Sequence, residues 1–177
     1  MRSRKLGTSS PTSTPLTPTS ALELRPIRFE EAASILELIQ RAIERGCREH
    51  YSPAQRRAVF LTYAQGLFAE VPGPLVSIVA AQRGAPVGFG QLDPSTGRLR
   101  ALFVEGERQR AGIGSLLLSE IENHVRRSGG RRLIGAMSLN AVSFYARAGF
   151  RPCGGPERLT SAGVALPVVR MEKLLRR

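Results

Sequence analysis

The chain has 177 residues but no tryptophan, and aromatic residues make up only 6% of it. Proteins that bind single-stranded nucleic acid stack the bases on aromatic side chains placed among basic ones. No such interleaving of aromatic and basic residues is present. The composition therefore argues against a nucleic-acid-binding function, and we expect no nucleic-acid partner.

Cysteine is also scarce, because Cys47 and Cys153 are the only two and do not form a CxxC pair. A structural zinc site needs four ligands at short spacings. The two cysteines, together with His50 and His124, lack that spacing, so we expect no metal. Two cysteines without a secretion signal are typical of reduced thiols in the cytoplasm, where we expect the protein to reside.

Long apolar runs are absent as well. No stretch of about 18 apolar residues occurs, so we expect no membrane-spanning helix. Residues 1–5 are basic, but residues 6–20 are polar and lack the apolar region of a secretory signal. We expect residues 1–20, rich in Ser, Thr and Pro, to form a disordered tail. Organelle transit peptides also begin without acids, but their amphipathic periodicity is missing here.

Positive charge is what the chain has in excess. The net charge is +12, and only Lys5 and Lys173 of the 26 basic residues are lysines. Arginine pairs with phosphate and carboxylate groups, so the excess indicates either an anionic ligand or nucleic acid, or else a generally basic surface. No basic block of five or more residues occurs. We favour a basic surface that helps to attract a polyanionic cofactor.

Hydrophobic periodicity predicts one α/β domain over residues 21–177, a mixed central sheet flanked by helices on both faces. The segment 112–127 is the clearest helix, with Ile113, Leu116, Leu117, Ile121 and Val125 as its inward stripe. The other expected helices are 30–44, 53–69 and 141–148. The expected strands are 22–29, 75–82, 87–92, 98–104, 132–137, 150–152 and 164–173.

A glycine-containing turn lies between the strand 98–104 and the helix that follows. Gly112 and Gly114 open this helix, where unpaired backbone N–H groups and the helix dipole favour an anion. Glycine allows a phosphate to approach closely. A dinucleotide fingerprint would need a third glycine where Leu117 stands, and a Walker motif would need a lysine nearby. The turn has the chemistry of a pyrophosphate-binding site.

Two motifs together resemble the Gcn5-related N-acetyltransferase (GNAT) family. The first has the form Q/R-x-x-G-x-G/A and is Gln109-Arg110-Ala111-Gly112-Ile113-Gly114. The second, N-x-x-x-x-Y-x-x-x-G-F, runs from Asn140 through Tyr145 to Phe150. The residues Arg170 to Lys173 are similar to the usual last strand. Gly106 and Ala111 depart mildly from the pattern, since proline and glycine are common there.

The resemblance implies a fold, a cosubstrate and roles for particular residues. Acetyl-CoA would bind between two parallel strands that splay apart. These are the expected strand 98–104, which ends at Val104, and the expected strand 132–137. Tyr145 would protonate the departing thiolate, as a positioned phenol can do. The backbone of Phe103 and Val104, together with Asn140, would contact the pantetheine arm. The pyrophosphate would be bound by Gln109, Arg110, Ala111, Gly112, Ile113, Gly114 and Ser115.

No residue in the sequence stands out as the general base. Gln91 and Arg100 occupy positions where many relatives carry a carboxylate, and neither is a base. Glu105 could act through water. A histidine such as His50 suits base work near neutral pH, but we favour the interpretation that His50 is a partly exposed loop residue. An acceptor side poor in carboxylates and rich in arginine suits an anionic or neutral amine better than a polyamine.

We therefore expect an N-acetyltransferase that acts on the primary amine of a small molecule or a peptide. The alternatives are a non-catalytic acyl-CoA sensor and a basic nucleic-acid-associated protein. A sensor would not need Tyr145. The glycine turn would bind phosphate in an acetyltransferase and in a sensor alike, so it does not separate these two functions. Many relatives dimerise, which leaves a homodimer open. The segment His50-Tyr51-Ser52-Pro53 resembles an uncharacterised bacterial subgroup of the family.

Overall fold

The computed structural model describes residues 22–66, 74–155 and 157–176. The expected tail, residues 1–20, and the expected end of the second helix at Ala69 lie outside this part. The helices are α1 (Ala32–Gly46), α2 (Pro53–Gly66), α3 (Ile113–Arg127) and α4 (Val142–Arg147). Short 3-10 turns occupy Phe29–Glu31, Gly106–Arg108 and Leu139–Ala141.

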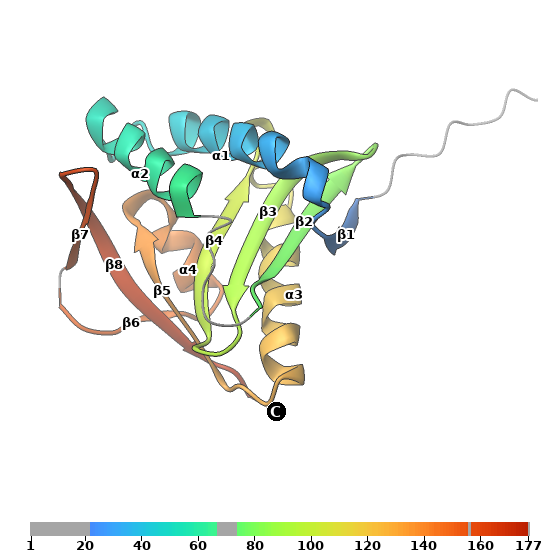
Figure 1. The fold of residues 1–177 in the computed structure, drawn as a ribbon. Helices are drawn as coiled ribbons and strands as arrows, with labels where there is room; N and C mark the ends of the chain where they lie inside the picture. Colours follow the sequence, from blue (N-terminus) through green and yellow to red (C-terminus); the bar gives the residue numbers. More distant parts are fainter. Residues whose placement is uncertain (1–21, 67–73, 156, 177) are drawn as a thin grey trace, which may run out of the picture.

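One mixed sheet of eight strands runs through the described residues (Figure 1). Its order is β1-β2-β3-β4-β5-β8-β6, and β7 pairs with β8 on the edge opposite β5. The strands are β1 (Glu23–Pro26), β2 (Val76–Gln82), β3 (Ala85–Asp93), β4 (Arg98–Val104), β5 (Arg132–Ser138), β6 (Arg151–Pro152), β7 (Glu157–Ser161) and β8 (Val164–Leu174). All pairs are antiparallel except β4 with β5.

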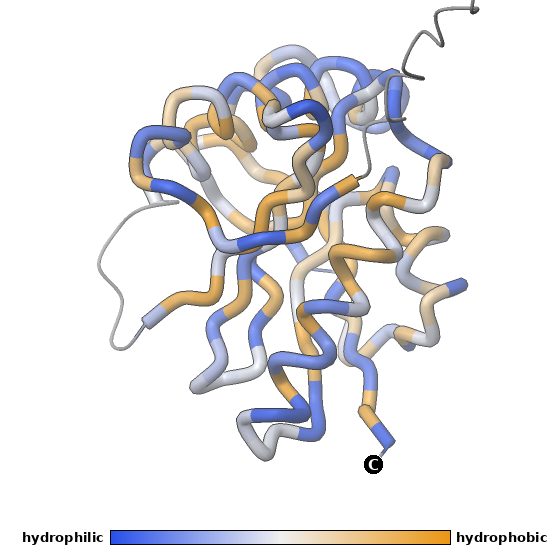
Figure 2. Tube along the Cα trace, turned by 90° about the vertical axis from the view of Figure 1, so that its right-hand side faces the viewer, coloured by the Kyte–Doolittle hydropathy of each residue, from blue (hydrophilic) through white to orange (hydrophobic). Residues whose placement is uncertain are grey.

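Helices cover both faces of the sheet, as predicted. On one face, α1 packs its apolar stripe of Ile35, Leu38, Ile39 and Ile43 against residues of β2, β3 and β4. On the other, α3 and α4 pack in a second cluster around Leu117, Ile121 and Tyr145. Figure 2 shows hydrophilic residues gathered at the end of α3 near the C-terminus, where the helix leaves the core.

The inward stripe predicted for α3 needs one correction. Leu116 is 48% exposed, whereas Leu118 is 3% exposed and belongs to the core. Successive residues of a helix are about 100° apart, so only one neighbour of Leu117 can share the face centred on Leu117 and Ile121. The helix turns Leu118 toward the sheet and Leu116 toward solvent.

Strand β7 was not predicted from the sequence. This strand forms a hairpin with β8 through Ala162 and Gly163, whose φ angles are 48° and 75°. Positive φ at both positions is the geometry of a two-residue type I′ turn. Gly163 was the one sequence signal for this turn. The segment 157–161 is short, and its side chains alternate only between partly buried and exposed, so it has no clear strand pattern.

Candidate functional site

The two parallel strands of the sheet separate soon after they meet. Strands β4 and β5 pair at Arg98 with Ile134, and the Ile134 N–H donates to Gly97 O at 3.0 Å. Each strand continues along its other neighbour, β3 or β8. The expected splay is therefore present, and a cavity of about 280 Å³ lies beside these strands.

A β-bulge shapes the wall of this cavity. Leu92 of β3 pairs with Leu99 and Gln91 pairs with Ala101, so Arg100 is an extra residue in β4. Bulges increase local twist and re-aim side chains. The Tyr63 hydroxyl on α2 donates to Arg100 O at 3.2 Å. The bulge and Tyr63 together hold Arg100 at the cavity.

The cavity is lined by elements from distant parts of the chain. Its walls come from the turn after α1, from α2, from β4 and β5, from α4 and from the β7–β8 hairpin. Tyr51 links the turn after α1 to β8 and to the 3-10 turn before α4, because its hydroxyl donates to Pro167 O at 2.7 Å and accepts from the Leu139 N–H at 3.0 Å. Apolar lining residues include Val59, Leu99, Ala101, Phe103, Met137, Leu159, Leu166 and Val168.

Tyr145 of α4 is a buried member of the cavity wall. Its ring meets Phe144 and Phe150 edge-on, with centroids 5.1 and 5.2 Å away. Burial raises the pKa of its hydroxyl above the ordinary value of tyrosine, so the phenol keeps its proton at neutral pH. Within the described residues, no group hydrogen-bonds to this hydroxyl.

The turn that opens α3 has a specific backbone shape. Arg110 has φ +67° and Gly112 has φ +82°. The first helical bond is from the Leu116 N–H to Gly112 O, so the preceding amides of the first turn have no acceptor within the helix. A Cβ atom on Gly114 would lie 3.4 Å from the Phe144 ring, so a small residue there lets the two motifs pack.

Gln109 and Asn140, one from each motif, meet at the end of α1. A Cβ atom built on Gly46 would lie 3.5 Å from the side-chain amide nitrogen of each. Gln109 also donates to Val104 O at 3.3 Å, and the Cys47 thiol donates to Asn140 Oδ1 at 3.3 Å. The helix end thus gathers two predicted cofactor-binding residues that stand 31 positions apart in the sequence.

The backbone amide of Val104 points toward the opening between β4 and β5. The Glu105 N–H donates to Val87 O of β3, and amide groups of an antiparallel strand alternate in direction. The amide of Val104 therefore points away from β3, whereas that of Phe103 faces Phe89 of β3. The Phe103 ring lines the cavity and meets Tyr63 edge-on at 4.8 Å.

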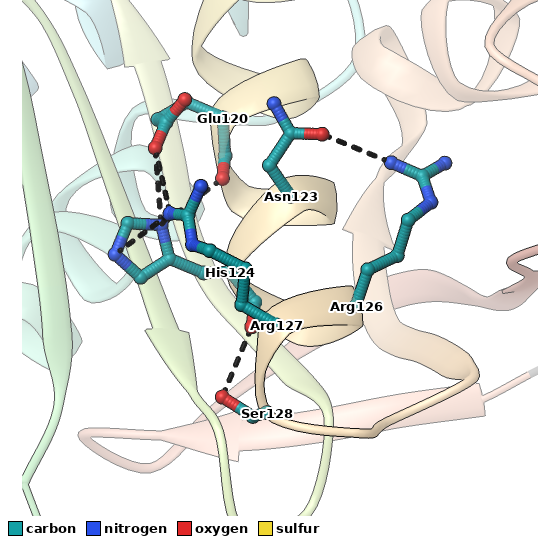
Figure 3. A network of polar contacts seen from close by, with 6 residues as sticks. All are labelled: Glu120, Asn123, His124, Arg126, Arg127 and Ser128. Carbon is teal, nitrogen blue, oxygen red and sulfur yellow. Dashed lines mark hydrogen bonds and ion pairs between the residues drawn. The ribbon is translucent and has the colours of Figure 1, made fainter. Parts of the chain in front are cut away.

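Neither histidine lines the cavity. His50 is exposed in the turn between α1 and α2. His124 lies in a polar network on α3, with Nδ1 at 3.2 Å from Glu120 Oε1, and Arg127 reaches the same oxygen at 3.0 Å (Figure 3). Glu105, the other candidate for a base, pairs with Arg41 at 3.3 Å and with Arg108 at 4.0 Å. None of these three residues is therefore among the described residues that line the cavity.

In the described part of the chain, no group of three or more His, Cys, Asp or Glu side chains is placed to hold a metal ion. Among the described helices, none has the length and apolar character needed to cross a bilayer.

Comparison with known proteins connects this geometry to one family. The family model described as an acetyltransferase (GNAT) domain matches residues 47–175. No curated protein matched the chain. Among solved structures, a GCN5-related N-acetyltransferase from Rhodopseudomonas palustris is 24% identical with a TM-score of 0.75, covering 90% of this chain and 99% of that one.

Two further solved structures share the fold at lower identity. PaiA N-acetyltransferase from Thermoplasma acidophilum, solved with coenzyme A, is 19% identical with a TM-score of 0.67, over 87% of this chain and 99% of that one. The ribosomal-protein-S18-alanine N-acetyltransferase from Escherichia coli is 16% identical with a TM-score of 0.64, over 89% and 96%.

Proposed function

Because the chain belongs to the GNAT acetyltransferase family, we propose that it moves an acetyl group from acetyl-CoA to a primary amine by direct attack. The acceptor would be a small molecule or a peptide. One observation carries the proposal: strand β4 leads from the wall of a cavity that contains Tyr145, through the loop of residues 105–112, to the amide groups that open α3. One continuous segment would thus contact the thioester at the cavity and bind the pyrophosphate at the start of α3.

The residues along this segment fit coenzyme A by their chemistry. The Val104 amide points to the open side of β4 and would bond the pantetheine arm. The Phe103 backbone faces β3 instead, so Phe103 would contact the arm only through its ring, and Asn140 would contact it from the turn before α4. The amides that begin α3 would bind the pyrophosphate with help from Arg110, within the predicted segment 109–115. Gly112 supports this binding role, because its positive φ forms the turn and its lack of a side chain leaves the space beside the amides open.

The reaction itself needs one attack and two proton movements. The amine nitrogen forms a bond to the thioester carbonyl carbon, the carbon–sulfur bond breaks, and the sulfur leaves as a thiolate. Tyr145 would donate its hydroxyl proton to that thiolate, and the proton that the amine loses would return through water to the phenolate. Burial keeps the pKa of this phenol raised, so the hydroxyl still carries its proton when the thiolate forms.

The test measures thiol release from acetyl-CoA over a panel of amines, for the wild type and Tyr145→Phe. Loss of a general acid lowers the rate by about 10²-fold or more. Calorimetry should show that Tyr145→Phe still binds acetyl-CoA, because the hydroxyl would act on the leaving group. Full activity of the variant would remove Tyr145 from the acid role.

Two other outcomes would point to a different function. Tight binding of acetyl-CoA without turnover of any amine would favour the acyl-CoA sensor. Absence of binding would overturn the assignment of the cosubstrate.

A further inference from the structure

The cavity beside β4 and β5 has an unusual balance of charge for a site that receives an amine. Arg100 is the one charged residue among its described lining residues, and no Asp or Glu is among them. The remaining polar lining groups are neutral, such as Thr62, Tyr63 and Ser161. An amine arriving as an ammonium ion would therefore meet a positive charge and no negative one.

A second cavity of about 240 Å³ extends the same surface. It shares Arg100, Tyr63 and Leu159 with the first and adds Arg98 to the described lining. The charges of Arg98 and Arg100 both act on the Tyr63 hydroxyl and lower its pKa, although burial prevails and raises it to about 12. Positive potential is thus concentrated where the two cavities meet.

Arg100 has no carboxylate partner in the described chain. Its Nη2 donates to Gly66 O at 3.3 Å, and it forms no ion pair there. The carboxylate of Glu157, on which Arg98 acts from a distance, is held by Arg170 at 2.5 and 2.9 Å. A guanidinium has five N–H donors in a planar fork, so Arg100 keeps donors for a ligand.

Resting on the proposed acetyltransferase activity, we propose that the acceptor is an amine whose own molecule carries a carboxylate, which Arg100 binds. The class includes α-amino acids with apolar side chains, because Val59, Leu159 and Leu166 would contact the rest of the molecule. The carboxylate offsets the charge of the guanidinium, and the pair strengthens in a partly buried wall. Polyamines are disfavoured because they bring only positive charge.

The test compares each acceptor with its own carboxamide. Leucine, methionine and phenylalanine, with their three carboxamides, are offered to the wild type, Arg100→Gln and Arg158→Gln, and kcat/KM is measured by thiol release. Arg158 is the matched control, since it is exposed on β7 and lines neither cavity. The effect of a variant is compared within one acceptor, so differences in amine pKa cancel.

We expect Arg100→Gln to lower kcat/KM by about tenfold or more for the amino acids and by less than about twofold for the carboxamides. Arg158→Gln should change neither, and Arg100→Lys should restore part of the loss. Equal effects of Arg100→Gln on both kinds of acceptor would overturn the proposal. So would spermidine as the preferred acceptor of the wild type.

A binding measurement separates this proposal from the proposed activity. If no amine is acetylated, the activity fails, and thermal melting with coenzyme A plus leucine or leucinamide decides the rest. A rise in Tm with leucine alone, seen in the wild type and lost in Arg100→Gln, would support the anion site. No rise with leucine would overturn it.

Discussion

The thiol of Cys47 donates a hydrogen bond to Oδ1 of Asn140 at 3.3 Å, across 93 residues of sequence. The contact joins the end of α1 to the turn that precedes α4. Because it engages the oxygen of the Asn140 amide, the nitrogen is left facing the side on which Gln109 lies. Cys47 thereby orients a residue predicted to contact the cofactor without taking part in the chemistry.

The first prediction follows from this contact. Cys47→Ala should raise the KM for acetyl-CoA about two- to tenfold, since one net hydrogen bond is lost, and leave kcat nearly unchanged. Cys47→Ser should restore the KM, because a hydroxyl also donates. Cys153→Ala, at the chain's other free cysteine, should have no effect. A serine variant as weak as the alanine variant would show that the thiol matters only for packing.

Gly112 provides a second prediction. A Cβ atom there would meet nothing within 4 Å, yet φ is +82°, so the strain of a side chain is conformational. Gly112→Ala should lower the free energy of unfolding by about 1–2 kcal/mol and weaken acetyl-CoA binding. Urea titration and calorimetry measure these two effects.

Gly155 is the matched control for that substitution. It is equally open but lacks a left-handed φ, so Gly155→Ala should be tolerated. Equal stability of the two alanine variants would mean that the turn relaxes without cost.

The third prediction concerns the pH dependence of catalysis. No Asp, Glu or His is among the described residues that line the cavity. The value of kcat/KM should therefore rise with pH as the acceptor amine loses its own proton, tenfold per unit below the amine pKa. No fall is expected up to about pH 10, the ordinary pKa of tyrosine, because burial raises the pKa of Tyr145.

The test measures the pH profile of kcat/KM with two acceptor amines of different pKa. The profile should shift with the amine and be unchanged in His50→Gln. An inflection near pH 6–7 that is common to both amines and disappears in His50→Gln would identify His50 as the base.

The fourth prediction concerns stability in acid. Arg25 binds both carboxylate oxygens of Glu31, at 2.6 and 2.8 Å, and the Arg28 N–H donates at 2.9 Å. These contacts lower the pKa of Glu31 from about 4.5 to about 2. A lowered folded-state pKa stabilises the fold above about pH 4.5, and this contribution is lost as the pH falls toward 2.

Glu31→Gln should therefore cost roughly 1–3 kcal/mol at pH 7. Denaturant unfolding should show its difference from the wild type shrinking between about pH 4.5 and 2. Glu30→Gln is the control, since Glu30 is exposed and forms no ion pair in the described chain. A difference that stays constant over that range would contradict the linkage.

Some predictions from the sequence stay predictions. The cytoplasmic location, the homodimer and the subgroup suggested by His50-Tyr51-Ser52-Pro53 are in this class. The roles of Tyr145, Asn140 and the segment 109–115 are proposals that the geometry supports.

The sequence predicted most elements because their signals are local. Strand β4 was expected with its observed bounds, and α3 was expected within one residue, since glycine turns and apolar periodicity mark both. Strand β7 was missed because it is stabilised by pairing with β8, and its own residues carry only a weak pattern. Leu116 was misplaced because three consecutive leucines leave the exact face of the helix undetermined.

The sequence by itself determined the fold class, the family and the order of the two motifs, because these depend on spacing along the chain. Only the tertiary structure decided which side chains converge. The bulge at Arg100 depends on its register with β3, and the meeting of Cys47 with Asn140 depends on where α1 ends against the sheet. Such contacts join residues far apart in sequence, and packing of the whole domain sets their distance.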